Sequence, residues 1–178
     1  LALACWCSWR HPRADLSGIL RGACSRRRWK LKALSPFFKY FGSKRNSAWK
    51  YPRPRYRTII EPFAGGAGYS LNYWDRDVVL YDLDERVIAI WKYLIGATAK
   101  DILAIPLMEE GQDVSSVDAS DGAKLLLSCL VNTTPFRKVL TTWKIGPRFS
   151  GLWGPNKRAS IARQIHAINH WRAEVASY

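Results

Sequence analysis

A glycine-rich segment in the first half of the chain has the residue types of a site for a nucleoside-containing ligand. Glu61-Pro-Phe-Ala-Gly-Gly-Ala-Gly68 follows a short apolar run, and Asp82 lies 17 residues after Gly65. Glycines let a backbone approach a ligand closely because they lack a Cβ and readily adopt positive φ. An acid at the end of the next strand, roughly 20 residues on, can accept hydrogen bonds from a ribose diol. The spacing therefore predicts a turn and an acid that act on one ligand.

Two cofactors could carry that ribose. The glycines do not follow the Gly-x-Gly-x-x-Gly pattern of nicotinamide dinucleotide sites, and an acid and a proline precede them. A carboxylate such as Glu61 suits a ligand with an amino group and a sulfonium centre better than one with phosphates. The pattern therefore favours S-adenosylmethionine, with a nicotinamide cofactor as the less favoured alternative.

A second cluster, Phe37-Phe-Lys-Tyr-Phe-Gly-Ser-Lys44, lies just upstream. An aromatic ring beside a small-residue turn can stack on adenine, and a lysine can pair with a carboxylate. The same cluster could equally form a strand edge on the core, so its residue types alone do not decide between the two interpretations.

Three segments together resemble the adenine-specific DNA methyltransferases of the D12 (Dam-like) class. They are Lys39–Lys44, Glu61–Gly68 and Tyr81-Asp-Leu-Asp84, in this order and spacing, within residues 35–98. The resemblance implies that Tyr40 and Lys44 contact S-adenosylmethionine and that Asp82 holds its ribose. The floor of the cofactor site would then consist of Glu61, Pro62, Phe63, Gly65, Gly66 and Gly68. The family usually has Trp where this chain has Tyr40, and two glycines where it has Gly42-Ser43.

The catalytic motif of that family has no counterpart in this sequence. The family holds the flipped adenine with Asp-Pro-Pro-Tyr or a close variant, placed after a DNA-recognition insert. The nearest candidate, Asn132-Thr-Thr-Pro-Phe136, lacks adjacent prolines and is typical of a turn. We therefore assign no catalytic residue and interpret the chain as the front part of a methyltransferase, inactive alone. The alternatives are a truncated remnant that only binds DNA or cofactor, and a methyltransferase for RNA or a small molecule.

The elements that must position these residues follow an α/β pattern. Residues 57–61 and 77–81 read as buried strands, residues 69–74 as the start of a helix, and residues 85–95 as an apolar helix ended by Gly96. Strand, glycine turn, helix, strand and acid form the first half of a doubly wound, Rossmann-like sheet. The prediction is an incomplete α/β methyltransferase sheet followed by a mostly helical DNA-recognition insert.

We predict that the chain consists of three parts. Residues 1–34 are expected to be a basic extension, residues 35–98 the cofactor half, and residues 99–178 the recognition region. Within the last part we predict helices at 101–107, from about 121 to 131, and at 157–173. The basic-aromatic loop 141–153 holds Lys144 and Arg148, which we predict to contact DNA, against the alternative of an ordinary solvated surface.

The charge of the chain is concentrated at one end. Residues 1–60 contain 15 Lys and Arg and one acid, which gives +14, whereas the remainder is neutral. Such a bias indicates a nucleic-acid or membrane-surface element, and the expected partner is double-stranded DNA rather than a membrane. Residues 1–34 would be either disordered or an anchor on the DNA backbone.

Cys5-x-Cys7 has no second pair that would complete a zinc site, so no metal is expected. Four cysteines without a secretory signal fit a reducing cytoplasm, and the resemblance to the Dam-like class implies a bacterial or phage-encoded protein.

Overall fold

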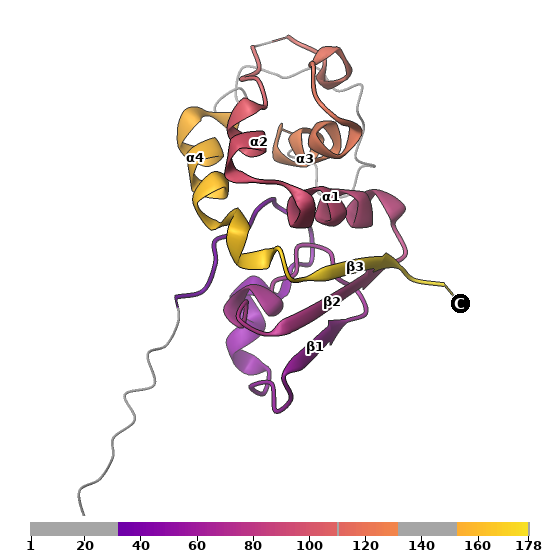
Figure 1. Cartoon of the computed structure of the whole chain (residues 1–178). Helices are drawn as coiled ribbons and strands as arrows, with labels where there is room; N and C mark the ends of the chain where they lie inside the picture. The colour runs from indigo at the N-terminus through magenta and orange to yellow at the C-terminus, as the bar shows by residue number, and fades with distance from the viewer. Residues whose placement is uncertain (1–31, 110, 132–152, 178) are drawn as a thin grey trace, which may run out of the picture. The chain divides into compact units, whose positions relative to one another are not determined.

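The computed structural model describes residues 32–109, 111–131 and 153–177, all within a compact unit that begins at Leu31. Residues 1–31 lie outside the described residues. The described secondary structure, shown in Figure 1, is in chain order η2 (Lys44–Lys50), β1 (Thr58–Glu61), η3 (Ser70–Asn72), β2 (Asp77–Asp82), α1 (Glu85–Gly96), α2 (Ala99–Ala104), η4 (Val114–Ser116), α3 (Asp121–Val131), α4 (Pro155–Gln164), η6 (Ile165–Ile168) and β3 (Arg172–Val175).

The three described strands form one parallel sheet in the order β1-β2-β3. Ile59 pairs with Val78, and Leu80 pairs with Ala173, and all four side chains are buried. In a parallel sheet such residues are covered by crossover helices. Here α1 packs on β2 and β3, and α3 packs on the far side of α1 (Figure 1). The described part of the chain is therefore an α/β fold with a small parallel sheet, compatible with part of a Rossmann-like fold.

Helix α1 confirms the prediction for residues 85–95, for local reasons. Asp84 is its N-cap, and its side chain accepts a hydrogen bond from the backbone N–H of Arg86. That bond satisfies one of the amides that the first turn of a helix leaves unpaired. The apolar stripe predicted from the sequence is buried, namely Val87, Ile88, Ile90, Trp91 and Leu94. The helix thus begins directly after the acids that end β2, which places its N-terminus at the strand ends.

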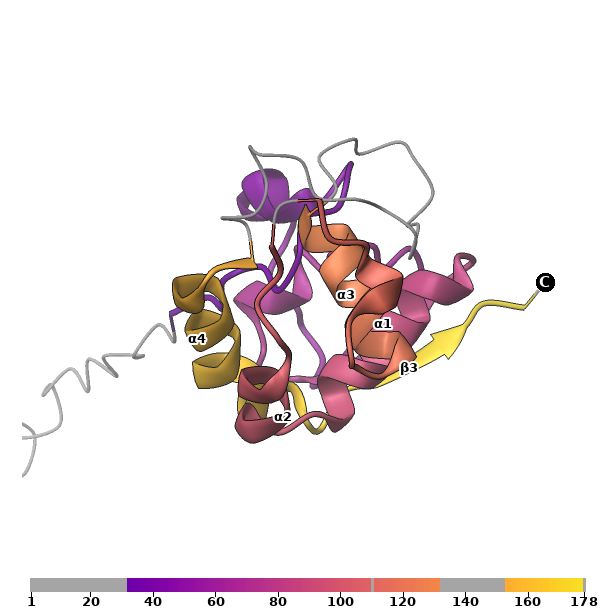
Figure 2. The same cartoon turned by 90° about the horizontal axis from the view of Figure 1, so that it is seen from above.

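The other helices pack in pairs. α2 lies beside α4, and α1 lies beside α3, in both views of the molecule (Figures 1 and 2). Thr98 and Asp101 form a capping box that starts α2, and Ser120 precedes α3, where its hydroxyl accepts from the N–H of Ala123. Gly122 allows the α1–α3 approach, because a Cβ on it would lie 2.6 Å from the Cβ of Tyr93.

Three helix predictions were wrong in extent. The helix predicted at 101–107 is α2, which begins at Ala99 and ends at Ala104. The predicted helix at 157–173 ends at Gln164, continues as the 3-10 turn η6, and gives way to β3 from Arg172. The side chains that suggested one long helix are all buried: Ile161, Ile165, Ile168 and Trp171. Pairing of β3 with β2 overrides the helical period, so residues 172–175 belong to the sheet and not to a helical insert. Likewise, the predicted helix at 69–74 is only the 3-10 turn η3.

The core begins before the predicted boundary at residue 35. Leu34 is buried, and its carbonyl accepts a hydrogen bond of 2.6 Å from Nη1 of Arg45. The carbonyl of Lys32 accepts from Nε1 of Trp74 at 3.2 Å. The last residues assigned to the basic extension are therefore attached to the folded unit.

Two kinds of feature, a membrane-spanning helix and a metal-binding cluster, are missing from the described residues. No helix within the described ranges is long and apolar enough to span a membrane. In that same part of the chain, no group of three or more His, Cys, Asp or Glu side chains is placed to hold a metal ion.

Candidate functional site

The structure brings the two predicted cofactor segments into direct contact. Tyr40 begins a turn in which the N–H of Ser43 donates to the carbonyl of Tyr40 at 3.2 Å, with Gly42 at φ 75°. This turn lies against the glycine-rich turn that follows β1. A Cβ on Gly65 would lie 2.7 Å from Cδ1 of Tyr40, and a Cβ on Gly68 would lie 2.8 Å from Oγ of Ser43. Neither position could hold a larger residue without moving its neighbours.

The glycines therefore serve a different purpose from the one expected. The sequence suggested that they admit a ligand, whereas in the structure they admit the segment from Tyr40 to Arg45. Gly65 also has φ 44°, which favours glycine independently of the contact. Gly66 makes the same kind of approach, with its hypothetical Cβ 3.4 Å from Oγ of Ser43. The glycine turn thus packs against the aromatic segment, and a ligand would bind beside the turn and the segment together.

Asp82 fixes the glycine-rich turn to the end of β2. Its Oδ2 accepts from the N–H of Gly65 at 2.9 Å, and its Oδ1 accepts from the N–H of Asp84 at 3.0 Å. The carbonyl of Gly65 in turn accepts from Nε1 of Trp91 at 2.8 Å. A carboxylate has about four acceptor positions, so these two bonds leave Asp82 able to accept from a diol. The predicted ribose-binding residue lies at the predicted strand end and is held there by the backbone.

Tyr40 lies close to the acids that end β2. Burial raises the pKa of its phenol, and the negative charges of Asp82 and Asp84 raise it further. The phenol is therefore neutral at physiological pH and can donate a hydrogen bond. With 37% of its surface exposed, Tyr40 is held against Gly65 yet remains accessible from outside. Its predecessors Phe37 and Phe38 are buried against Trp91, which anchors the segment.

Sequence reasoning missed three residues around Tyr40. Asp84 forms an ion pair with Arg86, with 2.7 Å between Oδ2 and Nη2, and this hydrogen bond lowers the pKa of Asp84. Cys129 of α3 is close enough to Asp84 and Arg86 to feel both charges, and burial raises its pKa to about 12, so its thiol stays neutral. The position of Asp84 as an N-cap was a usable signal, whereas nothing in the sequence connects α3 with this site.

Glu61 has a structural role that the sequence did not suggest. Its Oε1 accepts from both the N–H and the Oγ of Ser70 at 2.7 Å, so it holds the start of η3 against β1. Burial raises the pKa of this carboxyl, against the effect of its hydrogen bonds from Ser70. Glu61 thus stabilises the glycine turn, and it lies at the same end of the sheet as Asp82.

The remaining predicted residues are less enclosed. Pro62 and Lys44 are exposed, and Phe63 is 75% exposed. Lys44 begins η2 next to Gly68, and its backbone nitrogen would lie 2.9 Å from a Cβ on that glycine. The predicted DNA-contacting residues Lys144 and Arg148, and the segment 132–136, lie outside the described residues.

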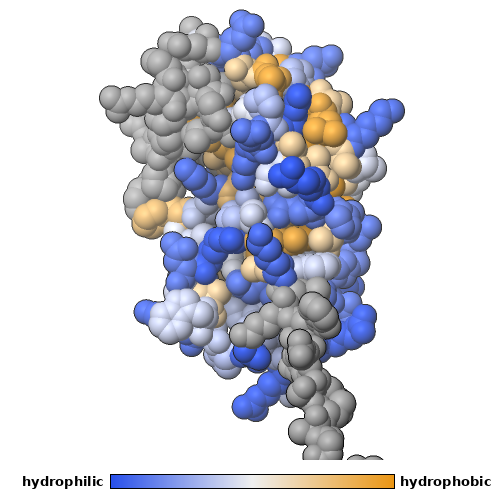
Figure 3. Space-filling view, turned by 90° about the vertical axis from the view of Figure 1, so that its left-hand side faces the viewer, coloured by the Kyte–Doolittle hydropathy of each residue, from blue (hydrophilic) through white to orange (hydrophobic). Residues whose placement is uncertain are grey.

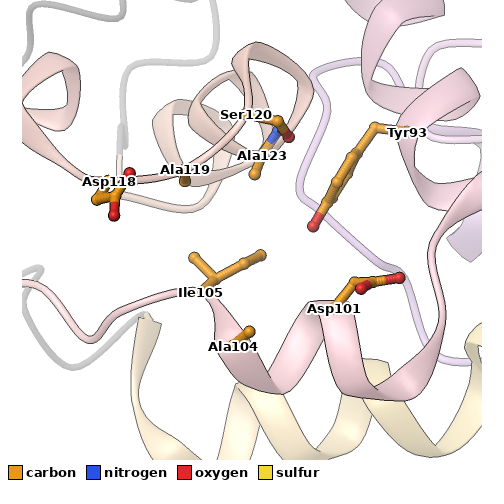
Figure 4. A pocket seen from close by; sticks show the side chains of 8 residues that line it. All are labelled: Tyr93, Asp101, Ala104, Ile105, Asp118, Ala119, Ser120 and Ala123. Carbon is orange, nitrogen blue, oxygen red and sulfur yellow. The ribbon is translucent and has the colours of Figure 1, made fainter.

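A cavity of about 280 Å³ lies elsewhere in the molecule, between α1, α2 and α3 (Figure 4). Its lining contains none of the predicted site residues, and consists of Tyr93, Asp101, Ala104, Ile105, Asp118, Ala119, Ser120 and Ala123. Two of its polar side chains have structural partners, because Asp101 accepts from Thr98 and Ser120 accepts from Ala123. The candidate site is instead at the carboxyl ends of β1 and β2.

The raised pKa of Glu61 gives a testable pH dependence. A carboxyl whose pKa is higher in the folded state costs stability as the pH rises from its unfolded value through its folded value. Glu61→Gln removes the charge and keeps an oxygen that can accept from Ser70. We expect equal free energies of unfolding below about pH 4, and a more stable variant at neutral pH. Urea unfolding at several pH values measures this, and a wild type that gains on the variant with rising pH contradicts it.

No protein-family model matches the chain, and no curated protein matches it either. The interpretation of function therefore depends on the residues of this chain.

Proposed function

We propose that this chain is the cofactor-binding part of an S-adenosylmethionine-dependent methyltransferase whose substrate is adenine N6 in DNA. The observation that carries the proposal is the contact between the turn at Tyr40 and the turn at Gly65–Gly68, with Asp82 bonded to the second turn. Both turns lie at the carboxyl ends of neighbouring parallel strands, where α/β sheets bind their ligands. The choice of DNA adenine as substrate rests on the resemblance to the D12 class.

The chemistry of the side chains fits this cofactor. Asp82 supplies acceptors for a ribose diol, the accessible ring of Tyr40 can stack on adenine, and Lys44 can pair with the carboxylate of the methionine part. When bound, the cofactor supplies an electrophilic methyl group on its sulfonium. The role of this chain is to bind and orient that group, since the sequence contains no Asp-Pro-Pro-Tyr element to hold the target amine.

The proposal is tested by direct binding of S-adenosylmethionine to the full chain, measured by calorimetry. Asp82→Asn keeps the size of the side chain and one acceptor oxygen, but its amide nitrogen replaces the oxygen that accepts from either Gly65 or Asp84. The free energy of unfolding of the variant is therefore measured beside its affinity. Hydrogen bonds to a charged group contribute about 1.5–3 kcal/mol, so we expect affinity to fall roughly tenfold or more. Asp118→Asn makes the same change at an exposed acid away from the strand ends and is the matched control.

Two results would contradict the proposal. One is a folded wild-type chain that binds no S-adenosylmethionine, and the other is an Asp82→Asn variant that binds as tightly as the wild type. Methyl transfer from labelled cofactor into DNA separates an enzyme from a chain that only binds, which is the second candidate and is favoured by the missing Asp-Pro-Pro-Tyr element.

A further inference from the structure

An exposed strip of basic and aromatic side chains leads away from the glycine-rich turn. Residues 44–57 contain six Lys and Arg and no acid. Trp49 is 79% exposed and Tyr56 is 80% exposed. Between them lie three further exposed cations, and we call the five residues together the basic strip: Trp49, Lys50, Arg53, Arg55 and Tyr56.

The strip is attached to the folded unit at several points. η2 is closed by a bond of 3.2 Å from the N–H of Tyr51 to the carbonyl of Ala48, which is buried. The hydroxyl of Tyr69 donates to the carbonyl of Pro52 at 2.7 Å, and its ring meets that of Tyr51 edge-on at 6.2 Å. At the far end, Arg57 pairs with Asp77 at 2.9 Å. The side chains are therefore presented from a fixed backbone.

No residue of the basic strip takes part in an ion pair in the described part of the chain. Within residues 32–109, 111–131 and 153–177, ion pairs join Arg57 to Asp77 and Arg86 to Asp84, and neither includes a residue of the strip. Lys50 lies over the ring of Trp49, with Nζ 5.4 Å from its centroid. Hydrophilic side chains cover much of the face shown in Figure 3, which looks onto the side where α4 and η2 lie in Figure 1.

A second basic cluster includes Arg45 of η2 itself. Nζ of Lys157 donates to the carbonyl of Pro36 at 2.8 Å, and its pKa is lowered to about 8, first by burial and then by the charges of Lys39 and Arg45. Lys39 is exposed and Arg45 is half-buried. Positive charge therefore extends beyond the strip through η2 to Lys39 and to Lys157 of α4, which favours a long polyanion over a small anion.

We propose that the basic strip binds the backbone of the DNA substrate and stacks on its exposed bases. Guanidinium and ammonium groups bind phosphates, and accessible aromatic rings are the platforms on which unpaired bases stack. Residues 51–57 form no helix and contain two prolines, so they offer a membrane surface no amphipathic helix with an apolar face. The strip starts at the end of η2, and η2 itself begins beside Gly68, so DNA bound along η2 and the strip passes near the strand ends. This inference rests on the proposed function, and it gives DNA a contact surface other than Lys144 and Arg148.

The test measures binding of a labelled DNA duplex to the full chain at several salt concentrations, by fluorescence anisotropy. The variant Lys50→Gln/Arg53→Gln/Arg55→Gln removes three charges, and Lys92→Gln/Lys100→Gln/Arg163→Gln removes three exposed charges from the helices. The slope of log affinity against log salt falls by about 0.9 for each lost phosphate contact. We expect the strip variant to lower the slope by about 2–3 and the control variant to leave it nearly unchanged.

A second pair of variants examines the rings. Trp49→Ala/Tyr56→Ala should weaken binding of single-stranded DNA at least about fivefold, while Leu103→Ala/Leu107→Ala, which removes two other exposed apolar side chains, should not. Equal effects of the strip and control triple variants would overturn the proposal, as would loss of binding to anionic vesicles with unchanged DNA binding. The strip variant should still bind S-adenosylmethionine like the wild type. A wild type that binds DNA through the strip but no cofactor would therefore refute the proposed function alone.

Discussion

Replacing Trp91 with alanine should lower the free energy of unfolding by about 3–5 kcal/mol. The ring is fully buried in α1, and it meets Phe38 with centroids 5.4 Å apart and Trp171 with centroids 5.9 Å apart. It therefore joins the segment before Tyr40 to the residue that precedes β3. Small domains have only about 5–15 kcal/mol of stability, so this one substitution would remove a large fraction of it. Urea unfolding followed by circular dichroism measures it.

Two further variants show which property of Trp91 matters. Trp91→Phe keeps much of the ring but leaves the carbonyl of Gly65 without its donor, so we expect a smaller loss of about 1–3 kcal/mol. Trp49→Ala removes the same type of side chain from a site that is 79% exposed, and should change stability by less than about 0.5 kcal/mol. Equal effects of Trp91→Ala and Trp49→Ala would contradict a central role for the buried ring.

Strands β1 and β2 and helix α1 were predictable because their signals are local. The run Asp77–Asp82 is apolar and β-branched between polar ends, and Asp84 stands where a helix N-cap is expected. Each of these patterns lies within a dozen residues, so neighbouring side chains alone define the element. For the same reason the position of Asp82 at a strand end was correct.

β3 could not be predicted in this way. Arg172–Val175 has only four residues, of which Ala173 alone is buried, and it follows directly on a stripe with helical spacing. What makes it a strand is its pairing with Val79–Asp82, more than 90 positions earlier in the chain. Contacts between such distant segments leave no pattern among neighbouring residues of the sequence. The order of the three strands is therefore known from the structure alone.

The sequence indicated which segments form the candidate site, but not which groups their residues contact. Tyr40 and the glycine turn were assigned to one ligand, whereas they first contact each other, and Glu61 supports η3 through Ser70. A sequence shows that glycine is needed at a position, but it does not show whether a ligand or another part of the chain occupies the space. The same holds for Cys129, whose neighbours come from a different helix.

That distinction makes Gly68 the most informative position in the site. A Cβ there would lie 2.8 Å from Oγ of Ser43 and 2.9 Å from the backbone nitrogen of Lys44. Backbone atoms cannot move aside as a flexible side chain can, so Gly68→Ala must displace the segment that carries Tyr40 and Lys44. We expect a loss of stability of about 1–3 kcal/mol and, under the proposed function, loss of most of the affinity for S-adenosylmethionine.

Gly96→Ala is the matched control. It adds the same methyl group at the end of α1, where no atom lies within 4 Å of the new Cβ. Because alanine is the better helix former, this variant should be as stable as the wild type or more stable by up to about 1 kcal/mol, with unchanged cofactor affinity. If Gly68→Ala loses affinity while its unfolding curve matches that of the wild type, the glycine admits a ligand directly. If both stability and affinity fall together, Gly68 acts by holding the two turns in contact.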